Sequence, residues 1–167
     1  MPPRAAVLVL GVLTLAAGSA SSQARPPAIR MAGPVVERLF GGDTQLTVLG
    51  YRWTGLGPSG LGFDGTLGFA PQGLAAGTLI IQADAGVVQS ISAGPIRLLL
   101  GGGLTHIVQL KRSFEFYPGL QARVALLVPV EARLAVRVDL TRRLYLAAGE
   151  TYPFWSLGFS LPAVARR

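Results

Sequence analysis

The sequence predicts an all-β fold, a closed antiparallel up-and-down β-barrel of eight strands that is transmembrane. Half of the 167 residues are hydrophobic, and only 14% are charged. Beyond residue 24, however, no apolar stretch approaches the roughly 20 residues that a membrane-spanning helix needs. The hydrophobic residues instead recur at every second position, which is typical of strands with two unlike faces.

The first residues predict export from the cytoplasm. Met1–Arg4 is short and positively charged, Ala5–Ala17 is apolar, and Ser22–Ala24 fits a small-x-small cleavage site. This is the order of regions in a secretory signal peptide. We therefore expect a signal peptide over residues 1–24, a linker over 25–32, the barrel domain over 33–162 and a tail over 163–167.

Eight segments of the remaining chain predict strands, and the first of them alternates least clearly. In the third segment, large apolar residues such as Phe63 share one face, while Asp64 and small residues share the other. In the first segment, Glu37 and Arg38 fall on opposite faces, so its alternation is poor. The eight segments are 33–40, 44–54, 60–70, 78–88, 95–106, 118–128, 132–142 and 153–161.

The connections between these segments carry turn residues. Gly55–Gly60 matches the pattern G-x-G-x-x-G, but a dinucleotide site needs a helix after that motif. Pro58 and the alternating strand that follows are incompatible with such a helix, so we interpret the motif as a turn. We interpret Pro71–Gly73 as a turn as well. Two connections look longer, at 109–116 and 143–152. Alternating short and long connections are typical of membrane barrels.

The parity of the charged residues predicts which face is the interior. A solvated outer face would normally carry roughly 25–35% charged residues, and a charge that faces lipid costs on the order of 2–4 kcal/mol. We therefore expect an apolar exterior and a narrow lumen filled by an ion-pair network. The charges that share the small, polar face are Arg52, Asp64, Asp84, Arg97, Arg123, Arg133, Arg137 and Asp139.

With this pattern, the chain resembles the bacterial outer-membrane β-barrel domain family, the small eight-stranded barrels that include the OmpA-type transmembrane domain. The resemblance is carried by the signal peptide and by alternating stretches such as Gly119–Leu126 and Arg133–Leu140. It implies an outer-membrane location, contact with outer-membrane lipid, handling by the barrel-assembly machinery, and a monomer. Members commonly end on an aromatic residue, whereas here eight residues follow Phe159.

Composition limits the chemistry further. The chain has no cysteine, so disulfides and cysteine-containing metal sites are excluded. Its formal net charge is +7, but the charges form no basic run, so we expect no nucleic-acid partner. We also expect no metal and no cofactor, because the single histidine, His106, cannot supply a cluster of ligands.

These observations favour a structural or surface-interaction role without catalysis. Three alternatives stay open. The first is a narrow, porin-like pore, which five lumen arginines against three aspartates would bias toward anions. The second is a soluble exported barrel that binds a hydrophobic ligand in an apolar interior. The third is a lipid-modifying enzyme that depends on His106; Ser113 and Glu115 lie in the next connection, but nothing at suitable spacing marks a partner serine and acid.

Overall fold

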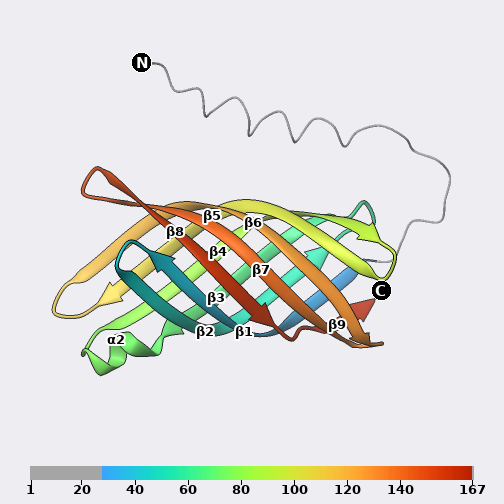
Figure 1. The fold of residues 1–167 in the computed structure, drawn as a ribbon, viewed down its shortest axis with the longest axis horizontal. Coiled ribbons are helices and arrows are strands. Elements are labelled where there is room, and N and C mark those ends of the chain that lie inside the picture. Colours follow the sequence, from blue (N-terminus) through green and yellow to red (C-terminus); the bar gives the residue numbers. More distant parts are fainter. Residues whose placement is uncertain (1–27, 167) are drawn as a thin grey trace, which may run out of the picture.

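Eight antiparallel strands form a closed ring in the computed structural model, which describes residues 28–166 (Figure 1). Each strand pairs with the next along the chain, and β1 closes the ring by pairing with β8. The predicted up-and-down barrel is therefore confirmed. The strands are β1 (Ile29–Gly41), β2 (Thr44–Leu56), β3 (Leu61–Ala70), β4 (Leu79–Ala93), β5 (Ile96–Leu110), β6 (Phe114–Glu131), β7 (Leu134–Ala147) and β8 (Glu150–Ser160).

A ninth, short strand differs from the expected domain boundaries. β9 (Ala163–Arg166) pairs with the first residues of β1, from Ile29 opposite Arg166 to Ala32 opposite Ala163. The expected linker and tail therefore lie partly in the sheet. Because Ile29 and Met31 continue the inward apolar face of β1 and are buried, extending the strand removes apolar surface from water. The expected signal peptide, residues 1–24, lies outside the described residues.

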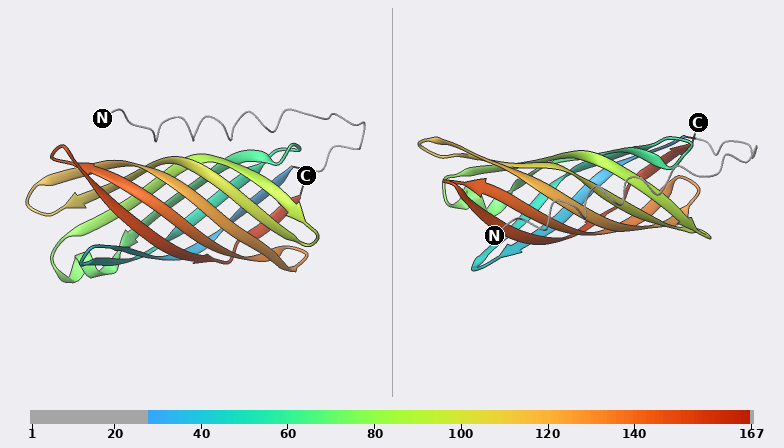
Figure 2. Two further views of the ribbon diagram at one scale, coloured as in Figure 1. Left: turned by 45° about the horizontal axis from the view of Figure 1, so that its top comes forward. Right: turned by 90° about the horizontal axis from the view of Figure 1, so that it is seen from above.

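The barrel has two different ends, which we call the base and the mouth. The base is the end at which β1 begins and β9 lies, and it carries the connections β2–β3, β4–β5 and β6–β7. The mouth is the opposite end and carries the other four connections (Figure 2). The longest mouth connection joins β3 to β4 and holds the short helix α2 (Pro71–Ala75), where the sequence predicted only a turn.

The two longer connections expected at 109–116 and 143–152 are wrong. β5 continues to Leu110 and β6 begins at Phe114, so only three residues separate them. β7 and β8 are joined by Ala148 and Gly149 alone, both at positive φ, 50° and 82°. Alternation weakens near these turns, yet the ladder hydrogen bonds continue. Among the described residues, no helix is long and apolar enough to cross a membrane.

The outer face of the sheet is apolar and the inner face carries charges, the reverse of a water-soluble barrel. More than twice as many large apolar side chains are exposed on the outside as are buried inside. Leu67 and Leu157, each about half exposed, are examples, while Arg137 and Asp139 are buried. The predicted apolar exterior and charged interior therefore describe the structure.

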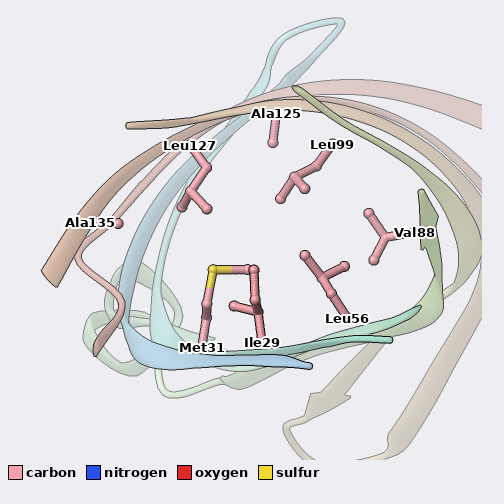
Figure 3. Close-up of a cluster of buried hydrophobic side chains, with 8 residues drawn as sticks. All are labelled: Ile29, Met31, Leu56, Val88, Leu99, Ala125, Leu127 and Ala135. Atoms are coloured by element: carbon pink, nitrogen blue, oxygen red, sulfur yellow. The ribbon is translucent and has the colours of Figure 1, made fainter. Parts of the chain in front are cut away.

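The lumen is layered along its axis. Near the base, apolar side chains from β1, β2, β4, β5, β6 and β7 point into the interior (Figure 3). A smaller apolar cluster of Leu39, Val48 and Ala70 lies toward the mouth. Charged side chains occupy the layer between these clusters. The base cluster consists of Ile29, Met31, Leu56, Val88, Leu99, Ala125, Leu127 and Ala135.

Inward glycines bring two neighbouring strands close together. Gly86 of β4 lies opposite Gly103 of β5. A Cβ atom on Gly103 would lie 2.2 Å from the carbonyl oxygen of Ala85, which is backbone and cannot swing away. Gly158 of β8 is different, because a Cβ there would lie 3.5 Å from the Cβ of Asp139, an ordinary contact. Glycine is thus required at Gly103 and dispensable at Gly158.

Candidate functional site

Four arginines and four carboxylates form a closed ring of alternating charge across the middle of the lumen. Each arginine contacts at least two carboxylates, and each carboxylate contacts at least two arginines. One further contact crosses the ring, because Arg123 Nε also lies 3.8 Å from Asp139 Oδ1. We call this set the charge ring. In order around it, the members are Glu37, Arg52, Asp139, Arg137, Asp64, Arg123, Asp84 and Arg143, which contacts Glu37 again.

The contacts within the charge ring are close. Arg137 has Nη1 at 2.9 Å from Asp64 Oδ1 and Nη2 at 2.8 Å from Asp139 Oδ1. Arg143 Nη2 lies 2.8 Å from Asp84 Oδ2 and 2.9 Å from Glu37 Oε1. The weakest link joins Arg52 Nη2 to Glu37 Oε2 at 3.9 Å. Arg52–Asp139 and Arg123–Asp64 complete the circle.

Neutral hydroxyl groups take up part of the hydrogen-bonding capacity that the ion pairs leave over. Thr105 donates to Asp84 Oδ1 at 2.6 Å, and Ser156 donates to Glu37 Oε1 at 2.6 Å. Arg52 Nε donates to Thr66 Oγ1 at 2.9 Å, and Arg123 Nε donates to Thr141 Oγ1 at 3.1 Å. Buried charges are tolerated when they are paired and hydrogen-bonded. Every member of this ring is paired, while Arg52 Nη2 and Arg143 Nε have no hydrogen-bond partner among the described residues.

The structure brings together six of the eight residues that the sequence placed in the lumen. Arg97 and Arg133 are not among them. Arg97 is partly buried near the base, where its Nη1 donates to Ser90 Oγ at 3.4 Å, and Arg133 is exposed in the β6–β7 turn. Both have the inward parity, but they lie at the end of the barrel where a side chain can reach water.

Sequence reasoning missed two members of the charge ring, Glu37 and Arg143. Glu37 lies on β1, whose alternation is disturbed because Arg38 points outward and donates to Gln45 and Thr47. Arg143 follows Arg142, and the sequence suggested that the strand ended there. Arg142 points outward, 4.9 Å from the centre of the Trp155 ring. Both members could have been found from the alternation, because each occupies an inward-facing position once its strand is extended to its full length.

The charge ring is neutral and tightly packed. Its four positive and four negative charges cancel, so the interior has no anion bias of the kind that five arginines and three aspartates would give. Its members are almost fully buried, at 0–6% exposure. A cavity of about 10 Å³ beside Asp64, Gly86 and Arg123 is the size of about one water molecule.

A wider cavity of about 700 Å³ opens at the mouth above the charge ring. We call it the vestibule. Its floor includes Tyr145, whose hydroxyl lies 3.1 Å from Thr105 Oγ1 and whose ring meets Phe154 edge-on at 5.7 Å between centroids. The inward-facing residues around it are Thr44, Leu46, Ile107, Gln109, Glu115, Tyr117, Tyr145, Ala147, Tyr152 and Phe154.

His106 lies on the outer surface of β5 and belongs neither to the charge ring nor to the lining of the vestibule. Its ring is tilted against Phe116 at 5.2 Å between centroids, and its Nδ1 has no hydrogen-bond partner among the described residues. Ser113 is in the β5–β6 turn, and Glu115 accepts from Tyr117 instead. Within residues 28–166, no group of three or more His, Cys, Asp or Glu side chains is placed to hold a metal ion.

No family model matches the chain, and no curated protein matches it in sequence. Solved structures do match its fold. Neisserial surface protein A aligns with 13% identity and a TM-score of 0.59, over 84% of this chain and 97% of that one. The N-terminal β-barrel domain of Pseudomonas aeruginosa OprF aligns with 9% identity and a TM-score of 0.64, over 84% and 98%.

The outer membrane protein OprG from Pseudomonas aeruginosa aligns with 8% identity and a TM-score of 0.58, over 86% of this chain and 98% of that one. In each case nearly the whole of the matched chain is covered, so the likeness extends to the complete barrel rather than to a shared hairpin. At these identities the likeness concerns architecture and not individual residues. The chain has the fold of the small eight-stranded outer-membrane barrels.

Proposed function

We propose that this chain is an exported bacterial outer-membrane protein whose barrel stands in the lipid as a closed, non-conducting body with a structural or surface-interaction role. The observation that carries the proposal is the inversion of the two faces: a continuous apolar exterior surrounds a neutral ring of buried charges. It would be a monomer in contact with outer-membrane lipid, delivered there by the barrel-assembly machinery.

The apolar exterior supports the membrane location. Soluble monomers rarely expose contiguous apolar patches larger than a few hundred Å², whereas here every strand presents large apolar side chains outward. Aromatic side chains lie on the outer surface toward both ends, with Phe40 and Trp155 near the mouth and Trp53 and Phe63 near the base. Membrane barrels place aromatic girdles at these levels.

The same geometry weighs against two of the alternatives. A soluble barrel that binds a hydrophobic ligand needs an apolar interior, but the middle of this lumen is charged and its exterior is apolar, so that alternative does not hold. A pore needs a continuous wet path, but the charge ring and the base cluster occupy two successive layers of the lumen. Eight-stranded barrels have room for side chains and little more.

The mouth supports a modest surface role. Its connections between β1 and β2, β5 and β6, and β7 and β8 are tight turns, so the strand ends and the vestibule form most of what faces outward. A large adhesive surface would need longer loops. Catalysis finds no support in the surroundings of His106, because the nearest aromatic contact is Phe116 and no partner carboxylate or hydroxyl bonds to it among the described residues.

Two measurements test the proposal. The mature protein should fractionate with outer membranes and show heat-modifiable gel migration, and a freely soluble monomer would overturn the membrane location. Purified protein in planar bilayers should show no stepwise conductance, because the charge ring closes the lumen. Steady single-channel currents that disappear when the protein is omitted would overturn the closed barrel while leaving the location intact.

A further inference from the structure

The vestibule gathers the tyrosines of the chain. Of the four tyrosines in the sequence, three line this cavity: Tyr117, Tyr145 and Tyr152. The fourth, Tyr51, is on the outer surface of β2 and is 51% exposed. In most membrane barrels the aromatic residues gather on the outside, so a concentration of them inside the mouth requires its own explanation.

The charged side chain that lines the vestibule is Glu115, a carboxylate, and the neutral Thr44 and Gln109 of the lining can both donate and accept hydrogen bonds. Tyr117 donates its hydroxyl proton to Glu115 Oε2 at 2.5 Å, and Tyr152 at the rim donates to Glu150 Oε2 at 3.0 Å. Both phenol protons are therefore engaged, and what these groups offer to a ligand is carboxylate charge, oxygen lone pairs and ring faces. The described residues that line the cavity include no lysine and no arginine.

The deeper part of the vestibule is apolar and anchored. Ile107 and Tyr145 are buried at 6% and 3% exposure, and Leu46 and Phe154 are half-buried beside them. Tyr145 is fixed by its hydroxyl contact with Thr105, which in turn donates to Asp84 of the charge ring. The floor is thus pre-formed, and the volume of about 700 Å³ lies within the range of small-molecule sites, roughly 300–1,000 Å³.

We propose that the vestibule binds a small organic cation, an alkylammonium compound whose charged head meets Glu115 and the faces of Tyr117 and Tyr152. Aromatic ring faces carry negative potential and attract ammonium groups. A nearby carboxylate adds attraction for the same charge, and the apolar floor accepts the alkyl part. An anionic ligand would meet Glu115 without a compensating cation in the lining. The proposal goes beyond the structural role, because the cavity exists whether or not the barrel sits in a membrane.

The test compares two probes of nearly equal shape. Choline carries a quaternary ammonium, and 3,3-dimethylbutan-1-ol replaces its nitrogen by carbon and is neutral. The full mature protein is folded in a non-ionic sugar detergent, since phosphocholine detergents would compete. Binding is detected by NMR, as saturation transfer from the protein to the methyl protons of the probe. Titrating each probe then gives its affinity. We expect choline to bind about tenfold more tightly than the neutral compound, the ratio that corresponds to about 1.4 kcal/mol.

Matched variants locate the site. Glu115→Gln and Tyr117→Leu should each weaken choline binding by about fivefold, within the range that cation–π and charge contacts allow. Their controls are Glu131→Gln, at the other end of the same strand β6, and Tyr51→Leu on the exterior, and neither should change the affinity. Heat-modifiable migration shows that each variant is folded.

Equal affinity for choline and the neutral compound would overturn the proposal, and this comparison needs only the wild-type protein. Unchanged choline binding in folded Glu115→Gln and Tyr117→Leu would also overturn it. These results leave the proposed membrane role untouched, because that role is judged by fractionation and conductance. Conversely, a soluble barrel that still prefers choline would refute the membrane role alone.

Discussion

Replacing Arg137 by methionine is the sharpest test of the charge ring. Arg137 is 1% exposed and reaches Asp64 at 2.9 Å, Asp139 at 2.8 Å and Thr54 Oγ1 at 2.8 Å. Methionine fills much of the same space but leaves both carboxylates with one arginine fewer. Removing one partner of a buried ion pair costs about 3–5 kcal/mol, and two carboxylates are affected here. We expect a loss of about 4 kcal/mol in the free energy of unfolding.

The measurement is denaturant unfolding in lipid vesicles, followed by the fluorescence of the two tryptophans, Trp53 and Trp155. Arg97→Met is the matched control, because Arg97 shares the inward parity but lies outside the charge ring. It should change the free energy of unfolding by less than about 0.5 kcal/mol. Adding Asp64→Asn to Arg137→Met restores neutrality, so the double variant should lose less than the sum of the single changes, by about 1–3 kcal/mol. An Arg137→Met protein as stable as wild type, or an Arg97→Met protein equally damaged, would refute the ring as described.

Three further predictions follow from packing, polarity and closure. Gly103→Ala should lower the free energy of unfolding by about 1–3 kcal/mol through overpacking, whereas Gly158→Ala should be nearly neutral in the same assay; equal effects would contradict the close approach of β4 and β5. In lipid vesicles, Leu67→Arg at mid-height on the exterior should lower the free energy of unfolding by about 2–4 kcal/mol, and Leu110→Arg at the mouth by only about 0–1 kcal/mol. A Leu67→Arg variant as stable as the wild type would indicate that the exterior faces water. Wild-type protein should conduct no ions in planar bilayers between low and high salt, and conductance that scales with salt would show an open lumen.

The strands and their faces could be predicted from sequence because a strand alternates strictly. Seven segments showed that alternation, and the structure places a strand over each of them. The first strand was the least certain, because Arg38 stands on the outer face. The structure resolves the conflict locally, since Arg38 Nη2 donates to Gln45 Oε1 at 2.6 Å close to the mouth, where an outward charge can reach polar surroundings.

The membership of the charge ring was less predictable, because parity gives the face of a residue and not its height along the barrel axis. Arg97 and Arg133 have the right face and the wrong height. Arg143 has both, but its strand continues farther toward the mouth than alternation suggested. Pairing also depends on register: Arg137 meets Asp64 across the lumen, and a contact between β7 and β3 leaves no trace in a single sequence.

The distribution of the charge ring along the chain divides the barrel into two complementary halves. The half from β1 to β4 contributes three acids and one arginine, a net charge of −2, and the half from β5 to β8 contributes three arginines and one acid, a net charge of +2. Neither half can neutralise its own interior, so a partial barrel would carry unpaired charge until the last strands meet. Two fragments divided at the β4–β5 turn would therefore attract each other, and the ion pairs of the lumen would stabilise only the complete barrel.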